Sequence, residues 1–235
     1  MTTLTPPLQH IAIICDGNRR WAKDQGLSPL EGHRVAVQET FPALVQHAAD
    51  LGIPYLTFWL FGKDNWQRDK AEVDHLLYLF ETMVSDAAIK DMQKKGARIK
   101  IIGDRSDFSP KLQKLFDKAE SQTAQGEKIT VTLALSYGGR DEIIRAQQKM
   151  LAQNPGLKPE QITADFFAQY LDTAFAPDPD LIIRTSGEIR LSGFMSWQNN
   201  YSEFYFPEIH FPEFKETALD EAIAEFQNRQ RRFGK

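Results

Sequence analysis

Four apolar segments of the chain are each followed directly by Gly, amide and charged side chains that could bind an anion. These junctions lie at residues 10–20, 55–68, 129–140 and 181–190. In the first of them, Asp16, Arg19 and Arg20 come immediately after the apolar run. A tight turn needs only Gly with Asn or Asp. The additional arginines therefore indicate an anionic ligand, and Asp16 beside them indicates a bound metal or a transferred proton.

A diphosphate is the anion that this composition fits best. Gly and Ser allow backbone N–H groups to approach phosphate oxygens, and arginine side chains supply positive charge. Each charge-assisted hydrogen bond contributes roughly 1.5–3 kcal/mol, so a few of them can hold a diphosphate without a phosphate loop. Neither G-x-x-x-x-G-K-[ST] nor G-x-G-x-x-G occurs, so a nucleotide ligand has no motif support. The apolar stretch 58–61 beside the polar residues fits a ligand with a hydrophobic tail.

The order of the apolar segments predicts the framework that brings these side chains together. Short apolar runs alternate with longer amphipathic stretches, which is typical of a single α/β domain with a central, mostly parallel sheet flanked by helices. Ligands of such open sheets bind outside the carboxyl ends of the strands, where the polar junctions would meet. The predicted strands are 10–15, 55–61, 97–102, 129–136 and 181–184. The predicted apolar helix stripes are Phe41, Leu44, Val45 and Ala48; Val73, Leu76, Leu77, Phe80 and Val84; and Leu219, Ala222, Ile223 and Phe226.

The composition of the chain restricts the cellular compartment and the binding partners that we expect for it. The 235 residues fit one domain, 1–235, in which residues 1–9 are expected to form a flexible N-terminus. The single cysteine excludes an internal disulfide and a cysteine-based zinc site. No stretch approaches the ~20 apolar residues of a membrane span, and the N-terminus lacks a signal-peptide pattern, so we expect a cytoplasmic protein. The net charge of −4 argues against nucleic acid as the main partner.

Five segments of the chain resemble, in order, the signature blocks of the cis-prenyltransferases, the undecaprenyl diphosphate synthase group. They are HIAIICDGNRRWAKDQG with the later GHR, LTFWLFGKDNWQR, ALSYGGRDEI, IRTSGEIRLSGFMSWQNNYSEFYF and NRQRRFG. The chain also lacks the D-D-x-x-D motif of trans-prenyltransferases. The resemblance implies the parallel-sheet cis-prenyltransferase fold. It also implies condensation of isopentenyl diphosphate with an allylic prenyl diphosphate, such as farnesyl or geranyl diphosphate, to a Z-polyprenyl diphosphate with release of diphosphate.

The same resemblance implies roles for individual residues. Asp16 matches the catalytic aspartate that holds Mg²⁺ and assists departure of the allylic diphosphate, and Glu203 matches a metal-linked glutamate near the dimer interface. Asn65 matches a catalytic residue implicated in positioning the substrates and in removing the proton after condensation. The residues implied to bind the substrates are Gly17, Asn18, Arg19, Arg20, Trp21, His33, Lys63, Asp64, Trp66, Arg68, Arg184, Arg190 and Ser192. Ser136 and segment 137–140 are expected to be structural.

Two departures from the family pattern bear on substrate binding and product length. Pro29 occupies a place where the bacterial pattern usually has an arginine that touches the allylic diphosphate, and Lys63 or Arg19 could supply the lost charge. The alternative is that Lys63 is a solvated loop lysine. Leu60 occupies a place where many long-chain enzymes have a smaller residue, which favours a short or medium product. The alternative is that Leu60 is an ordinary core residue.

Two other functions compete with this interpretation. A non-catalytic accessory subunit would keep the fold, but such relatives lose active-site residues, and Asp16, Asn65 and Glu203 are all present here. RNA binding by the basic segment 228–235 is the other alternative, although basic residues at a helix end are favourable without any ligand. The resemblance further implies a homodimer, and a lipid product allows at most peripheral contact with a membrane.

Overall fold

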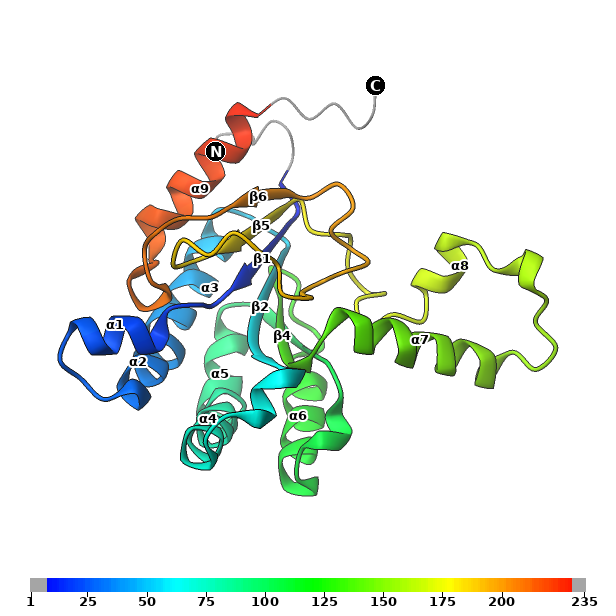
Figure 1. Cartoon of the computed structure of the whole chain (residues 1–235), viewed down its shortest axis with the longest axis horizontal. Coiled ribbons are helices and arrows are strands. Elements are labelled where there is room, and N and C mark those ends of the chain that lie inside the picture. The colour runs from blue at the N-terminus through cyan, green and yellow to red at the C-terminus, as the bar shows by residue number, and fades with distance from the viewer. Residues whose placement is uncertain (1–7, 230–235) are drawn as a thin grey trace.

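A six-stranded sheet forms the centre of the molecule (Figure 1). The computed structural model describes residues 8–229. The strands are β1 (His10–Ile14), β2 (Tyr55–Gly62), β3 (Ala97–Ile102), β4 (Ile129–Tyr137), β5 (Leu181–Arg184) and β6 (Glu203–Tyr205). They lie in the order β3-β4-β2-β1-β5-β6, and all neighbours are parallel. The predicted α/β fold with a parallel central sheet is therefore confirmed.

β1 lies between β2 and β5, and its register determines which side chains meet beyond the strand ends. All of its residues are buried, as expected for an apolar strand in the interior of a parallel sheet. Ile14 pairs with Trp59 of β2 and with Arg184 of β5. The residues that follow Ile14 therefore emerge between those that follow β2 and those that end β5.

The helices mostly follow the predicted apolar stripes. They are α1 (Asn18–Asp24), α2 (Pro29–Val35), α3 (Phe41–Asp50), α4 (Lys70–Met83), α5 (Asp86–Lys94), α6 (Pro110–Thr123), α7 (Gly139–Gln153), α8 (Ala164–Ala168) and α9 (Glu216–Asn228). A π-helical turn, η1 (Ala36–Thr40), joins α2 to α3, and short 3-10 helices include η2 (Lys63–Gln67) and η3 (Arg105–Asp107). Every residue of the predicted stripes is buried except Leu77, which is half-buried.

The two faces of the sheet are covered differently. Alternate strand residues point to opposite faces, and Ile11 and Ile13 belong to the main core, into which α3, α4, α5, α6 and α9 pack. Ala12 and Ile14 belong to a smaller cluster that is closed by Phe194. Residues 192–201 form successive turns rather than a helix, so irregular chain covers part of this second face. α7 and α8 share a third apolar cluster and project from the body as an arm (Figure 1).

The ends of the described chain bear on two of the sequence expectations. Of the expected flexible segment 1–9, residues 1–7 lie outside the described residues. Leu8 is buried in the main core, and the backbone N–H of Gln9 donates to Asp180 at 2.8 Å. Most of the basic segment 228–235 likewise lies outside the described residues. Between residues 8 and 229, no helix has the length and apolar character needed to cross a membrane.

Candidate active site

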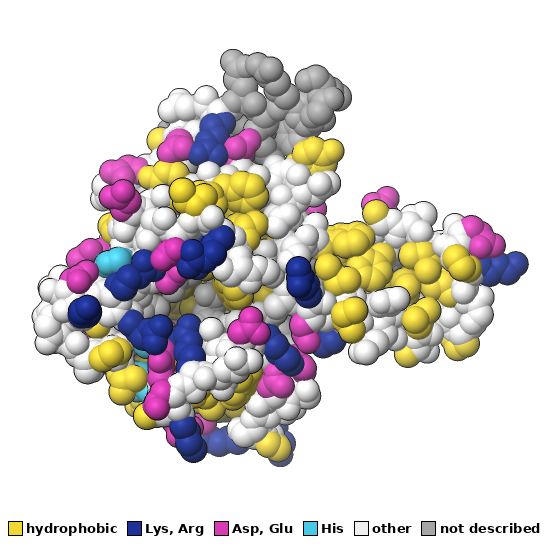
Figure 2. All heavy atoms as spheres, in the orientation of Figure 1, with side chains coloured by type: hydrophobic (Ala, Val, Ile, Leu, Met, Phe, Trp, Pro, Cys, Tyr) yellow, Lys and Arg dark blue, Asp and Glu magenta, His cyan; other side chains and the backbone are white. Residues whose placement is uncertain are grey.

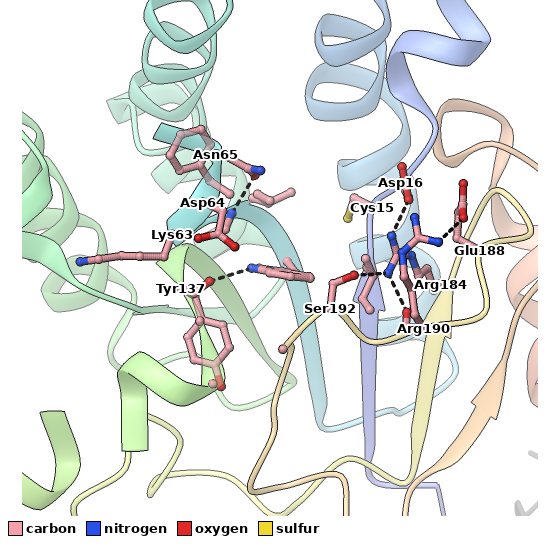
Figure 3. A pocket seen from close by; sticks show the side chains of 18 of the residues that line it. Cys15, Asp16, Lys63, Asp64, Asn65, Tyr137, Arg184, Glu188, Arg190 and Ser192 are labelled. Atoms are coloured by element: carbon pink, nitrogen blue, oxygen red, sulfur yellow. Dashed lines mark hydrogen bonds and ion pairs between the residues drawn. The ribbon is translucent and has the colours of Figure 1, made fainter. Parts of the chain in front are cut away.

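A cavity of about 1140 Å³ opens at the carboxyl ends of β1, β2, β4 and β5 (Figure 3). Its lining residues fall within segments 14–20, 59–68, 137–141 and 184–196, with His33 in addition. These segments contain the four polar junctions that the sequence singles out. The parallel sheet therefore brings all four junctions to one cavity, as expected.

Asp16 lies at the centre of a group of arginines and backbone donors. Its carboxylate accepts hydrogen bonds from Arg184 Nη2 at 2.9 Å, from Arg20 Nη2 at 3.2 Å and from the Gly17 N–H at 2.7 Å. Partial burial raises the pKa of Asp16, but these donors and charges outweigh the burial and leave the pKa below its usual value. Asp16 is therefore an ionised carboxylate at neutral pH and can attract a cation.

The turn after Asp16 requires glycine. Gly17 has a φ of +97°, and a Cβ atom at this position would lie 1.9 Å from Ser186 Oγ. Ser186 in turn hydrogen-bonds to His210 at 2.5 Å, which fixes the wall behind the turn. The close packing brings the Asp16 turn directly against the loop that follows β5.

Arg184 organises the loop that carries the second group of predicted anion-binding residues. The side chain is buried, and its Nη1 donates to the Arg190 carbonyl at 2.6 Å and to Ser192 Oγ at 2.8 Å (Figure 3). Glu188 accepts from Arg20 at 2.9 Å and also pairs with Arg190. The three arginines thus lie together around Asp16 and Glu188, in positions where an incoming diphosphate can compete for them.

Glu72 of α4 holds three residues that line the cavity, His33, Arg68 and Arg19. It accepts hydrogen bonds from His33 Nε2 at 3.3 Å, from Arg68 at 2.8 Å and from Arg19 at 3.4 Å. The bond from His33 and the charges of the two arginines, acting against burial, lower the pKa of Glu72 to about 2. Asn18 contacts the same group, because its amide nitrogen lies 3.4 Å from His33 Nδ1.

Asn65 lies in η2, where the chain leaves β2. Its Oδ1 accepts a hydrogen bond from the Gly62 N–H at 2.9 Å, and Asn65 and Asp64 both line the cavity. Lys63 also lines the cavity, but its ammonium group lies 2.6 Å from Asp104 and 2.8 Å from Asp107. Its side chain points away from Asp16 (Figure 3). Lys63 therefore directs its charge to these two carboxylates rather than to the Asp16 group.

Two of the predicted substrate-binding residues do not line the cavity. Trp21 lies on α1, and its buried Nε1 has no hydrogen-bond partner. Trp66 packs against Phe61 and Phe108 and donates through its Nε1 to Ser136 at 2.9 Å. Both tryptophans therefore lie outside the lining of this cavity, and Trp66 packs into the aromatic core beside it.

A family model described as "Putative undecaprenyl diphosphate synthase" matches residues 14–234. The chain belongs to the undecaprenyl diphosphate synthase family. It is 42% identical over 226 residues to an isoprenyl transferase of Ralstonia nicotianae, covering 96% of this chain and 87% of that protein. An isoprenyl transferase of Thermus thermophilus is 41% identical over 240 residues, covering 98% and 90%. The resemblance drawn from the sequence is therefore confirmed.

Solved structures of the family support the same assignment. Lavandulyl diphosphate synthase from Lavandula x intermedia, determined in complex with dimethylallyl diphosphate, matches with a TM-score of 0.92 and 36% identity. That match covers 97% of this chain and 98% of the plant protein. A probable undecaprenyl diphosphate synthase from Campylobacter jejuni matches with a TM-score of 0.79 and 32% identity, covering 97% and 99%. This family member thus shares its whole fold with prenyl diphosphate synthases.

Glu203 is not brought to Asp16 within one chain. It opens β6 beside Leu181, the first residue of β5, whereas Arg184 is the last residue of β5. Glu203 therefore lies toward the amino ends of the strands, where it accepts a hydrogen bond from Arg229 at 3.0 Å. Within a single chain, Asp16 and Glu203 therefore lie at opposite ends of the strands and do not meet around one metal.

The residues around Asp16 suit a hard divalent cation that is shared with a substrate. Within residues 8–229, no three His, Cys, Asp or Glu side chains converge to hold a metal by themselves. Mg²⁺ is usually bound by one or two carboxylates together with substrate phosphates. Asp16 supplies one ionised carboxylate, and Asn18 Oδ1 is a buried oxygen without a hydrogen-bond partner. The donors present fit such a cation.

Three residues in or beside the cavity were not predicted to bind a substrate. Glu72 occupies an ordinary polar position of an amphipathic helix, and nothing in its spacing marks it. Glu188 lies inside the quoted motif TSGEIR, so its acid among arginines was a usable signal. Arg140, expected to be structural, lines the cavity as an exposed cation.

Proposed function

We propose that this protein is a Mg²⁺-dependent cis-prenyltransferase, which condenses isopentenyl diphosphate with an allylic prenyl diphosphate and releases diphosphate. The observation that carries the proposal is the group of Arg20, Arg184 and Arg190 around Asp16 at the carboxyl ends of the strands. The similarity to a protein solved with dimethylallyl diphosphate supports an allylic diphosphate in the same cavity.

The arginines would stabilise the charge that develops when the allylic C–O bond breaks. Ionisation produces a carbocation and a diphosphate anion, and preorganised donors lower the energy of that anion. Asp16 and Glu188 hold the three guanidinium groups in place before substrate arrives. Arg190 and Ser192, with Arg184, would hold isopentenyl diphosphate so that its double bond lies close to the cation.

The remaining residues would supply the metal site, the proton transfer and a dry compartment. When bound at Asp16, Mg²⁺ would neutralise diphosphate oxygens as the bond breaks. Asn65 faces the cavity and would help position the isopentenyl group for loss of its proton. Trp59 and Leu60 line the same cavity and would keep water from the cation.

The position of Leu60 supports a short or medium product. This side chain lines the cavity and packs against the main core, and Ile14 and Phe61 line the cavity beside it. The residues that line the cavity lie at the carboxyl ends of the strands and in the segments that follow them, with His33 of α2 in addition. A growing chain would therefore meet Leu60 early. We propose farnesyl or geranyl diphosphate as the allylic primer.

We also propose a homodimer in the cytoplasm. α7 and the loop after it expose Ile144, Leu151 and Ile162, which are 53%, 52% and 41% exposed. Figure 2 shows hydrophobic side chains gathered on this arm. Burial of such a surface against a second copy would remove apolar area from water. A role of Glu203 at the metal would require that second copy.

The alternative is a non-catalytic accessory subunit, and one experiment separates the two functions. Purified protein is incubated with labelled isopentenyl diphosphate and, separately, dimethylallyl, geranyl or farnesyl diphosphate, with Mg²⁺ or with EDTA. We expect Mg²⁺-dependent incorporation into a chain-length ladder. A further arm contains dimethylallyl diphosphate alone, because one relative binds it. A folded protein that gives no product in any arm would favour the accessory subunit.

A further inference from the structure

Lys63 lies among carboxylates from two separate parts of the chain. Its Nζ is 2.6 Å from Asp104 Oδ2, 2.8 Å from Asp107 Oδ2 and 3.8 Å from Asp141 Oδ1. Asp104 and Asp107 lie in the turn after β3, and Asp141 lies in the first turn of α7. Lys63 itself begins η2, the turn that carries Asn65. One ammonium group therefore connects the Asn65 turn to two neighbouring elements.

A second connection closes a ring around Asn65. Asp107 also accepts a hydrogen bond from the Ser136 hydroxyl, and Ser136 Oγ accepts one from Trp66 Nε1 at 2.9 Å. Lys63 and Trp66, which lie on either side of residues 64–65, are thus both linked to Asp107. Ser136 is fully buried with a φ of +47°, so the surrounding structure holds it in a left-handed conformation that Ser rarely adopts.

This ring determines how Asn65 presents its amide. The Gly62 N–H donates to Asn65 Oδ1 at 2.9 Å, which fixes the orientation of the side chain. Asn65 Nδ2 has no hydrogen-bond partner within the described chain, and the residue lines the cavity. The amide NH₂ is therefore available to a ligand, provided that η2 stays in place.

The charges explain why Lys63 matters for that placement. Without its ammonium group, Asp104 and Asp107 would face each other without the cation that joins them, and Asp141 would keep only its pairing with Arg145 at 2.7 Å within the described chain. Like charges at such short range repel one another, and partial burial strengthens the repulsion. The turn after β3, the start of α7 and η2 would then separate, and Asn65 would move with η2.

We propose that Lys63 is a positioning residue, which holds η2 through Asp104, Asp107 and Asp141 so that Asn65 meets the substrate in one orientation. The inference rests on the proposed function, because Asn65 acts on substrate only in that reaction. The pairing of Lys63 with Asp104 and Asp107 favours Arg19, which also lines the cavity, as the residue that supplies the charge lost at Pro29.

The test measures kcat and the KM of both substrates for wild type, Lys63→Met, Lys63→Arg and Lys70→Met. Each protein is assayed in the oligomeric state in which it is purified. Lys70 is a matched control, because its side chain is 87% exposed and its one ion pair within residues 8–229 is with Asp74 at 2.6 Å. We expect Lys63→Met to lower kcat about 10-fold or more, with the KM of both substrates within about 2-fold. Lys63→Arg keeps the charge and should stay within about 3-fold of wild type. Lys70→Met should match wild type.

Three outcomes would overturn the inference while wild type remains active. They are a kcat for Lys63→Met equal to that of Lys70→Met, failure of Lys63→Arg to restore kcat, and a rise in the allylic KM alone. The last would show direct contact with the allylic diphosphate. If a thermal melt shows that Lys63→Met is unfolded, Asp107→Asn replaces it in the kinetic assay. The Asn oxygen can still accept the hydrogen bond from Ser136, but the charge that pairs with Lys63 is lost. An unchanged kcat for Asp107→Asn would refute the positioning role of Lys63. An inactive wild type would instead refute the proposed function.

Discussion

Glu72→Gln tests the carboxylate that holds His33, Arg68 and Arg19 together at the cavity. The substitution keeps the size and one acceptor oxygen but removes the charge that His33, Arg68 and Arg19 share. Glu72 is 9% exposed, so water can replace little of what is lost. We expect the free energy of unfolding to fall and the cavity wall to lose its order.

The pKa of Glu72 provides the magnitude. The folded protein lowers it from 4.5 to about 2, and each pKa unit corresponds to about 1.4 kcal/mol. The ionised carboxylate therefore stabilises the fold by about 3.5 kcal/mol as an upper value. This stabilisation is fully present above pH 4.5 and is lost as the pH falls toward about 2, because the folded pKa is the lower one.

The assay is urea unfolding of wild type, Glu72→Gln and Glu81→Gln between pH 7 and the lowest pH at which wild type stays folded. Glu81 is a matched control on α4, because it pairs with Lys111 at 2.7 Å on the surface. We expect Glu72→Gln to cost about 2–3 kcal/mol at pH 7 and less below pH 4.5. Glu81→Gln should cost less than about 1 kcal/mol. Equal costs for both variants, or a cost for Glu72→Gln that does not change with pH, would refute the reasoning.

Three further substitutions probe the cavity. Leu60→Ala should lengthen the product ladder by at least one isoprene unit in chromatography, whereas an unchanged ladder assigns Leu60 to the core alone. Arg140→Ala should raise the KM of at least one diphosphate substrate about 5-fold or more, since a charge-assisted bond is lost; unchanged constants would leave Arg140 outside binding. Gly17→Ala should abolish activity because its Cβ would lie 1.9 Å from Ser186 Oγ, whereas Gly26→Ala, with open space, should remain active.

The sheet and the position of the cavity follow from sequence because they depend on local patterns. Each predicted strand is a short apolar run bounded by polar residues, and its end agrees with the structure within one residue or is identical to it. β6 escaped prediction because Glu203–Tyr205 is short and only half-buried, so no apolar run marks it. Residues 192–201 form turns that place Phe194 and Met195 in the smaller core cluster. No periodic pattern in the sequence marks these two residues as buried.

The candidate site likewise contains residues that the sequence predicts and residues that it does not predict. Asp16 and Arg184 could be predicted because they directly follow or end predicted strands, and Arg190 because it lies in the polar segment after β5. The pairings that hold His33 and Lys63 could not be predicted, since Glu72 reaches His33 across 39 positions and Lys63 reaches Asp104 across 41. Such pairings depend on how helices and turns pack, and a sequence pattern contains no record of that packing. The position of Glu203 could not be predicted for the same reason, because it depends on the register between β5 and β6.

The Asp16–Arg184 group is the proposed site of prenyl condensation. Asp16→Asn tests it most directly, because the amide keeps the shape of the side chain and removes its charge. The measurement is the single-turnover rate at which labelled isopentenyl diphosphate enters a longer prenyl diphosphate with Mg²⁺, for wild type and variant of equal thermal stability. We expect the variant to be at least about 100-fold slower. A rate within about 3-fold of wild type would contradict the assignment of this cavity as the catalytic centre.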